Sequence, residues 1–185
     1  MFLSILHDFR LEIRCPRCGG RALWEEPFAF RSLKKVPEED RARMVRWGGW
    51  LVLEKFPSVI RWTPPRHGAG YGYHGIGVVR CWTCYAVVLH RLRWPADALF
   101  QWSVRGVTLY AWNAEHARVL LHYIGSTLRD PHRYGERYRT GLQRLPTGVM
   151  KGHARARLAG QIAASLRTHG LPLGPPPGSS SAPEK

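Results

Sequence analysis

The stretches Cys15-Pro-Arg-Cys-Gly19 and Cys81-Trp-Thr-Cys84 contain all four cysteines of this 185-residue chain. Each stretch lies between two segments rich in β-branched and aromatic residues, so each is expected to form the turn of a β-hairpin. Two hairpins of this kind can bring four thiolates together. The flanking strands are predicted over residues 9–13, 22–24, 76–80 and 85–93.

Four thiolates in two Cys-x-x-Cys turns are the ligand set of a tetrahedral zinc site, with Zn–S distances of about 2.3 Å. We therefore predict one structural Zn²⁺ bound by Cys15, Cys18, Cys81 and Cys84. A site closed by four cysteines has no open position for water or substrate, which argues for structure and against catalysis. Gly19 follows the second cysteine of its turn, where a positive φ is often required, and Tyr85 stands at the matching position of the second turn.

The two cysteine pairs are separated by 62 residues, from Cys18 to Cys81. Compared with a 15-residue loop, closing such a loop costs only about 1.2 kcal/mol more, whereas structural zinc contributes on the order of 10 kcal/mol. The free energy of zinc binding therefore exceeds the extra cost of closing the loop, so a zinc site is compatible with an insertion over 25–75. Two other interpretations are weaker. A redox Cys-x-x-Cys would lie at a strand-to-helix junction, and disulfides would need an exported protein, of which the sequence carries no sign.

The rest of the chain shows alternating strand and helix patterns. The insertion is expected to contain a helix over 37–47 and strands over 50–56 and 58–62. Beyond the second cysteine pair, a hairpin is predicted from 100–104 and 107–111. A helix follows from its N-cap Asn113 to Gly125, then a polar loop over 126–146 and a second helix over 148–168.

These elements predict an α+β fold, in which a four-cysteine zinc ribbon with a long inserted segment is extended by a β-hairpin and two C-terminal helices. The expected division is a zinc-ribbon domain over 1–125 and a basic loop with a C-terminal helix over 126–169. A Pro/Gly/Ser tail over 170–185 is expected to be disordered, because it has too little apolar surface to fold.

The charge is strongly positive, with 28 Lys and Arg against 13 Asp and Glu, which favours a polyanionic partner such as nucleic acid or a ribonucleoprotein. The largest excess lies in 130–170, where Arg and Tyr alternate before a basic helix. Arg can bind phosphates and Tyr can stack on unpaired bases. A solvated basic face is the alternative interpretation. The candidate nucleic-acid-binding residues are Arg133, Tyr134, Arg137, Tyr138, Arg139, Lys151, Arg155 and Arg157.

Other patterns in the chain predict less. No apolar run is long enough to span a membrane, and no export signal is recognised, so a cytoplasmic protein is expected. Gly70-Tyr-Gly-Tyr-His-Gly75 matches a dinucleotide-binding fingerprint, but it leads into a strand and not into a helix, so a loop is favoured. His90 is interpreted as a polar neighbour of the cysteine turns. We find no catalytic motif and expect no enzymatic activity.

Several stretches resemble a group of bacterial proteins labelled TFIIB-type zinc-ribbon-containing. They are Cys15-Pro-Arg-Cys-Gly19, Val78-Val-Arg-Cys-Trp-Thr-Cys84, Trp94-Pro-Ala-Asp97 and Arg105-Gly-Val-Thr-Leu-Tyr-Ala-Trp-Asn-Ala-Glu-His116. The resemblance covers 15–24 and 76–125, and it implies zinc binding by the four cysteines. The label reflects the ribbon alone, and such ribbons also serve as protein docking modules.

The sequence therefore favours a non-enzymatic, zinc-binding accessory protein that binds DNA, RNA or a ribonucleoprotein. The alternative is a protein-interaction adaptor in which the zinc ribbon is purely structural and a Trp-rich surface docks a protein partner.

Overall fold

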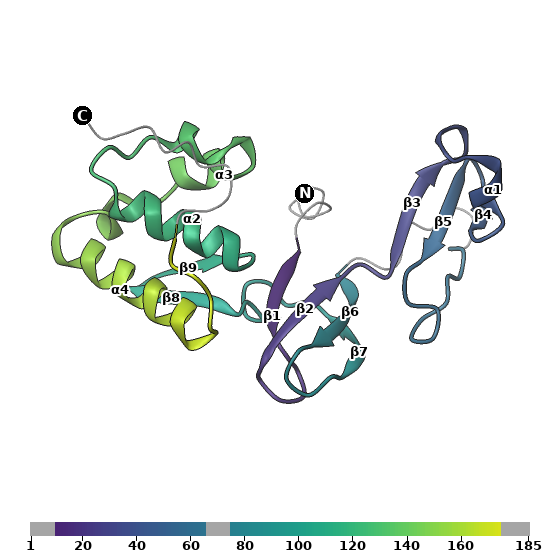
Figure 1. The fold of residues 1–185 in the computed structure, drawn as a ribbon, viewed down its shortest axis with the longest axis horizontal. Helices are drawn as coiled ribbons and strands as arrows, with labels where there is room; N and C mark the ends of the chain where they lie inside the picture. Colours follow the sequence, from purple (N-terminus) through teal and green to yellow (C-terminus); the bar gives the residue numbers. More distant parts are fainter. Residues whose placement is uncertain (1–9, 66–74, 175–185) are drawn as a thin grey trace. The chain divides into compact units, whose positions relative to one another are not determined.

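The computed structural model describes residues 10–65 and 75–174, and the chain divides into two compact units, Met1–Asp97 and Ala98–Lys185. The described residues form three antiparallel sheets and four α-helices, so the predicted α+β class is confirmed (Figure 1). The first unit holds two of the sheets and one short helix. The second holds a hairpin and three longer helices.

A four-stranded sheet, which we call the cysteine sheet, consists of β1 (Leu11–Arg14), β2 (Arg21–Glu25), β6 (Ile76–Cys81) and β7 (Val87–Arg91) in the order β1-β2-β6-β7. The two predicted hairpins are thus confirmed. They join because β2 pairs with β6, with Ala22 opposite Cys81. One face of this sheet is a buried apolar layer. It contains Leu11, Ile13, Ala22, Trp24 and Val79.

The insertion forms a sheet of its own, the insertion sheet, with the order β3-β5-β4. Its core is aromatic: Phe28, Phe30 and Trp47 each meet the ring of Trp62 nearly edge to face, with centroids 5.1–5.6 Å apart. The elements are β3 (Phe28–Ser32), η2 (Leu33–Lys35), α1 (Glu38–Arg41), β4 (Val45–Trp47) and β5 (Trp50–Glu54).

Two predictions for the insertion were wrong. The expected helix over 37–47 ends after one turn at Arg41, because Val45–Trp47 pairs with β5 across the turn at Gly48, whose φ is +56°. The expected strand over 58–62 is absent, because the N–H groups of Val59 and Ile60 both donate to the carbonyl of Phe56 and turn the chain.

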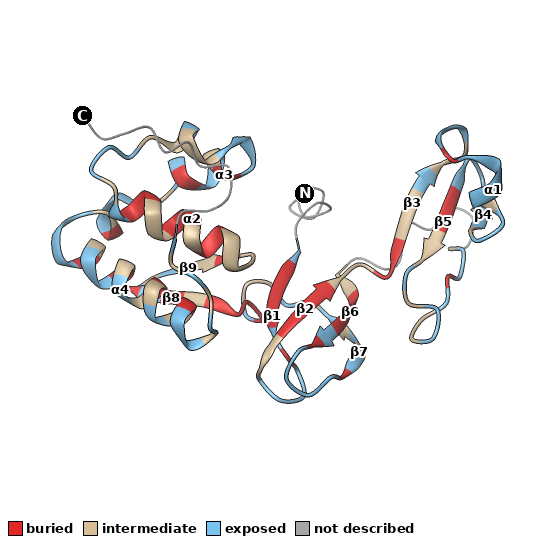
Figure 2. Ribbon diagram, viewed as in Figure 1, coloured by how far each residue is buried: buried red, intermediate tan, exposed pale blue. Residues whose placement is uncertain are grey.

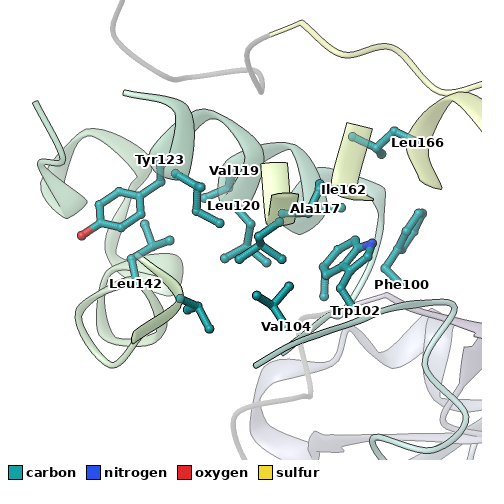
Figure 3. Close-up of a cluster of buried hydrophobic side chains, with 14 of the residues drawn as sticks. Phe100, Trp102, Val104, Ala117, Val119, Leu120, Tyr123, Leu142, Ile162 and Leu166 are labelled. Carbon is teal, nitrogen blue, oxygen red and sulfur yellow. The ribbon is translucent and has the colours of Figure 1, made fainter. Parts of the chain in front are cut away.

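The second unit packs a hairpin, β8 (Phe100–Val104) and β9 (Val107–Ala111), against its helices. The predicted hairpin is confirmed, and its turn residues Arg105 and Gly106 both have positive φ. Its apolar side chains meet those of the helices in one buried cluster (Figure 3). The helices are α2 (Ala114–Gly125), η3 (Pro131–Tyr134), α3 (Glu136–Gln143), η4 (Thr147–Val149) and α4 (Gly152–Thr168).

Helix α2 begins as predicted. The side chain of Asn113 accepts a hydrogen bond from the backbone N–H of His116, which satisfies one of the free donors at the helix start. The helix ends at Gly125 and buries Ala117, Leu120 and Ile124, the spacing expected of an amphipathic helix. The second predicted helix is also present, as α4, although it begins at Gly152 and not at 148.

The structure divides the chain differently from the expected boundary near 125. The hairpin and α2 belong to the second unit, because their core is shared with α3 and α4. The expected loop over 126–146 contains η3 and α3, and α3 buries Tyr138 and Leu142 (Figure 2). At the start of the expected tail, Leu171 and Leu173 pack on the same core. The remainder of that tail, 175–185, lies outside the described residues.

Candidate functional site

The four cysteines meet at one end of the cysteine sheet. Their sulphur atoms all lie within 4.8 Å of one another, with 3.8 Å between Cys15 and Cys84 and 3.6 Å between Cys18 and Cys81. All four are free thiols, since a disulfide would require about 2.05 Å. A group of four sulphur atoms at these distances could hold a metal ion.

The two cysteine turns have the same backbone construction. The N–H of Cys15 donates to the carbonyl of Gly20, and the N–H of Cys81 donates to that of Ala86, so each turn is closed by the same bond. The predicted positive φ after the second cysteine is observed at Gly19, at +73°, and Tyr85 adopts the same region, at +56°. This repeated geometry aims two thiolates from each turn at a common point.

Backbone N–H groups point at the sulphur atoms. Arg17 donates to Cys15, Gly20 to Cys18, and both Thr83 and Cys84 to Cys81, at 3.3–3.4 Å. Donors of this kind stabilise a thiolate, and no side chain has to be charged to provide them. The turns are therefore built to accept negative charge on sulphur.

The pKa values of Cys81 and Cys18 are shifted in opposite directions, as expected of neighbouring thiols that compete for this charge. Burial raises the pKa of Cys81, but the N–H groups of Cys84 and Thr83 outweigh it, and the pKa falls to about 6. The N–H of Gly20 lowers the pKa of Cys18, whereas desolvation and the three neighbouring sulphur atoms raise it, to about 12. Because one thiolate opposes the next, a cation among them is what would allow all four to ionise.

Residues around the turns fit closely. A Cβ atom at Gly20 would lie 2.4 Å from Oγ1 of Thr83, so only glycine fits where the two turns meet. The guanidinium of Arg21 makes two 2.9 Å bonds with the carboxylate of Glu12. It also lies over the ring of Trp82, 4.7 Å from the centroid. These contacts order the side chain of Trp82.

His90 lies at the other end of the sheet, since it pairs with Gly77 and not with the cysteine end of β6. Its Nε2 is 2.8 Å from Oδ2 of buried Asp97, and that same oxygen accepts the backbone N–H of Arg93 at 2.7 Å. Burial raises the pKa of Asp97, but the Arg93 N–H, the contact with His90 and the charge of Arg93 outweigh it and lower the pKa. His90 is therefore a polar partner within the fold and is not among the clustered ligands.

The predicted nucleic-acid-binding residues occupy η3, α3 and the start of α4 in the second unit. Lys151, Arg157 and Arg137 are exposed, while Arg133 and Arg155 are half-buried. No carboxylate of the described residues lies within ion-pair distance of Arg133, Lys151, Arg155 or Arg157. These four cations remain candidates for binding an anion.

The other four candidates have structural partners. Tyr138 is only 3% exposed, and its ring stacks near those of His116 and Trp112, so it cannot stack on a base as predicted. Arg137 lies over the Tyr138 ring and pairs with Glu115, and Arg139 pairs with Glu136. Tyr134 is half-buried against Tyr123. The alternating Arg and Tyr residues that suggested a nucleic-acid site are thus partly explained by contacts within the second unit.

The strand over 85–93 was predicted and is present as β7, but sequence reasoning missed that it forms an exposed apolar edge of the cysteine sheet. Val87 and Leu89 are each 48% exposed, and in the neighbouring cysteine turn Trp82 is 49% and Tyr85 84% exposed. The only signal in the sequence is Val87-Val-Leu89, in which three consecutive apolar residues occupy both faces of a strand. Which face would be exposed could not be determined without the pairing order.

Comparisons with protein-family models, curated proteins and solved structures gave no match to this chain. The resemblance to TFIIB-type zinc-ribbon-containing proteins therefore stays a prediction. Within residues 10–65 and 75–174, no helix is both long and apolar enough to cross a membrane. Of the Gly70–Gly75 motif, all but the last residue lies outside the described residues.

Proposed function

We propose that this chain is a non-enzymatic nucleic-acid-binding protein whose cysteine sheet is held together by one structural Zn²⁺. The observation that carries the metal assignment is the spacing of the sulphur atoms. A tetrahedron with Zn–S bonds of about 2.3 Å has edges of about 3.8 Å. The sulphur atoms of Cys15 and Cys84 are 3.8 Å apart, and those of Cys18 and Cys81 are 3.6 Å apart. Four sulphur ligands from the two turns would complete the coordination sphere and leave no open position for a substrate.

Zinc is favoured because the ligand set is entirely thiolate. Four thiolates in a tetrahedron are typical of Zn²⁺ or of iron, and hard oxygen-preferring cations are excluded. The lowered pKa of Cys81 favours its thiolate, which is the form that binds a metal. Elemental analysis separates zinc from iron.

The test of the metal is the zinc content of the purified chain, measured by mass spectrometry after removal of loosely bound ions. We expect one zinc per chain. Cys84→Ser is expected to lower the zinc content and the melting temperature, whereas Thr83→Ser, which changes the neighbouring residue without removing a thiolate, keeps both. Full zinc content in Cys84→Ser, or a different metal in the native chain, would contradict the assignment.

The nucleic-acid assignment is supported by the distribution of charge. Residues 98–174 contain 11 Lys and Arg but only 3 Asp and Glu. At the start of α4, the first turn has no acidic residue and Lys151 provides no side-chain cap. The guanidinium of Arg129 reaches the carbonyl of Met150, 3.5 Å away, which brings a second cation next to Lys151. Cations at a helix N-terminus are repelled by the positive end of the helix dipole, and a bound phosphate would offset that repulsion.

The test compares two triple variants at two salt concentrations, on duplex DNA, single-stranded DNA and structured RNA. Arg133→Ala, Lys151→Ala and Arg157→Ala together remove three candidate cations. Arg31→Ala, Arg43→Ala and Arg46→Ala remove three exposed cations of the insertion. We expect only the first set to reduce the salt slope, by about one unit per phosphate contact. Equal losses in the two variants, or weak binding that vanishes with salt, would mean that net charge alone attracts the polymer.

A second candidate function, a protein-interaction adaptor, is favoured by the exposed Trp82, Tyr85, Val87 and Leu89 on the cysteine sheet. Under this alternative, a protein partner co-purifies with the chain and remains bound after nuclease treatment and at high salt.

A further inference from the structure

The two edges of the cysteine sheet differ in whether another segment of the chain covers them. In β1 the outward-facing N–H of Arg14 donates to the carbonyl of Asp97 at 2.9 Å, so that edge is covered by the segment that follows β7. Strand β7 pairs with β6 alone among the described strands. Its other side is an open edge in this part of the chain.

The register shows which backbone groups face that open edge. The N–H of Leu92 donates to the carbonyl of Gly75, and the N–H of Cys81 donates to that of Ala86. Residues of an antiparallel strand alternate between bonding to one neighbour and facing the other side. The even-numbered residues 86–92 therefore bond to β6, and Val87, Leu89 and Arg91 direct their N–H and C=O groups outward.

The side chains of those same residues are exposed. Val87 lies opposite Arg80 and Leu89 opposite Val78, so both side chains project from one face of the sheet. Natural edge strands are protected by Lys, Pro, a bulge or inward-pointing charge. Here Arg91 is the only charged residue with outward-facing backbone groups in β7, and the apolar pair Val87 and Leu89 is unprotected. Unpaired donors next to exposed apolar side chains are the two parts of a strand-addition site.

Charge distinguishes between the possible occupants. Two copies of this chain would each carry a net charge of +15, which opposes their association. Arg91 continues the row of exposed side chains from Val87 and Leu89. Arg80 stands beside Val87 and is paired with Glu25. A complementary strand would present two apolar side chains opposite Val87 and Leu89, and a carboxylate opposite Arg91.

We propose that β7 binds an extended segment of a partner protein as a fifth strand, and that three alternate residues of this segment, one acidic and two apolar, face Arg91, Leu89 and Val87. The backbone of Val87, Leu89 and Arg91 provides the hydrogen bonds, and their side chains select the partner. Trp82, ordered by the guanidinium of Arg21, and Tyr85 extend the contact surface at the cysteine end. The site lies on the cysteine sheet and so rests on the proposed zinc-stabilised module, but it needs no nucleic acid.

The probe is a fluorescent peptide of sequence acetyl-Ser-Glu-Thr-Val-Thr-Val-Ser-amide, titrated with the full zinc-loaded chain and followed by anisotropy. When it runs antiparallel to β7, its Glu faces Arg91 and its two Val face Leu89 and Val87. We expect saturable binding tighter than about 1 mM. A peptide N-methylated at the Glu and Val amides, which face β7, is expected not to bind. The same peptide methylated at the two Thr amides, which face away, is expected to bind as the parent does.

Two substitutions in the chain test the site itself. Leu89→Lys places a charge on the edge and is expected to weaken binding about tenfold or more. Leu89→Pro removes an outward N–H that makes no bond to β6 and is expected to abolish binding. Leu128→Lys is the matched control, because Leu128 is also an exposed leucine and lies in the second unit. It is expected to leave binding unchanged.

The outcomes separate this proposal from the proposed function. Zinc content and nucleic-acid affinity are measured on the same samples. A loss of zinc or of nucleic-acid binding can therefore be distinguished from a loss of peptide binding. The absence of saturable peptide binding in a zinc-loaded chain overturns the strand-addition site. So does equal weakening by Leu128→Lys, or equal binding of both methylated peptides. Concentration-dependent dimers that Leu89→Pro abolishes would show that a second copy takes the edge and would also overturn it.

Discussion

The indole of Trp24 lies directly against the backbone of Gly77: a Cβ atom at position 77 would be 2.2 Å from Cε2 of the ring. The two residues belong to the paired strands β2 and β6, and Trp24 and Gly77 are both buried. The glycine therefore makes room for the largest side chain of the cysteine sheet. The two hairpins that carry the cysteine pairs are packed together through this contact.

Gly77→Ala is accordingly expected to destabilise the first unit by about 2–3 kcal/mol, because the ring or the strand must move to admit the methyl group. Gly141→Ala is the control. Gly141 lies inside α3 with no atom within 4 Å of its Cβ position, so alanine there is expected to stabilise the second unit by about 0.5–1 kcal/mol. Urea unfolding of both variants measures the difference. Equal stabilities would mean that Trp24 does not occupy this position.

Removal of the metal is expected to unfold one unit and leave the other. All four cysteines lie in Met1–Asp97, and the second unit has a hydrophobic core of its own. Because structural zinc contributes on the order of 10 kcal/mol, a chelator should abolish the order of the cysteine sheet. Backbone amide NMR signals of α2 and α4 are expected to persist. Their simultaneous loss would show that the two units fold together.

The second unit is expected to lose stability as the pH falls below about 6.5. Burial, helped by the charge of Arg137, lowers the pKa of His116 to about 3, and its Nδ1 accepts the N–H of Trp112. Between these pH values the unfolded chain takes up a proton that the folded unit does not, so the free energy of unfolding falls by about 1.4 kcal/mol per pH unit.

Thermal melts of the second-unit signals between pH 7 and 4.5 measure this dependence. His116→Gln, which has no titratable group, is expected to be less stable at pH 7 but nearly independent of pH over this range. An unchanged slope in the variant would assign the effect to another group.

Arg137 is expected to matter for stability more than for nucleic-acid binding. Its guanidinium pairs with Glu115 and lies 4.6 Å from the centre of the Tyr138 ring, so it joins α2 to α3. We expect Arg137→Ala to lower the free energy of unfolding by about 1 kcal/mol and to change affinity for nucleic acid less than Arg133→Ala does. A larger loss of affinity in Arg137→Ala than in Arg133→Ala would indicate that Arg137 does bind phosphate.

Local patterns predicted much of this chain because their causes are local. The cysteine turns follow from two short motifs and a glycine, and the start of α2 follows from Asn113, whose side chain caps a backbone N–H three residues away. The hairpin of β8 and β9 follows from alternation across two turn residues. In each case, the interacting groups are separated by only a few residues.

The predictions that were wrong depended on pairing and packing, which the composition of a segment does not reveal. The segment after Arg41 has helical composition, but Val45–Trp47 pairs with the neighbouring strand β5, which is itself paired with the more distant β3. Tyr138 alternates with arginines, yet it is buried because it stacks near Trp112 and His116. In both places tertiary contact outweighed local preference, and residue type alone could not reveal it.

The sequence by itself determined that four thiolates belong to two equivalent turns, that the chain is α+β and that its charge is strongly positive. Only the tertiary structure decided that the sulphur atoms all lie within 4.8 Å of one another, which cations lack acidic partners, and that β7 is the outer strand of its sheet. The reason is physical. Turn geometry and charge are properties of neighbouring residues, whereas strand order and burial depend on which distant segments pair.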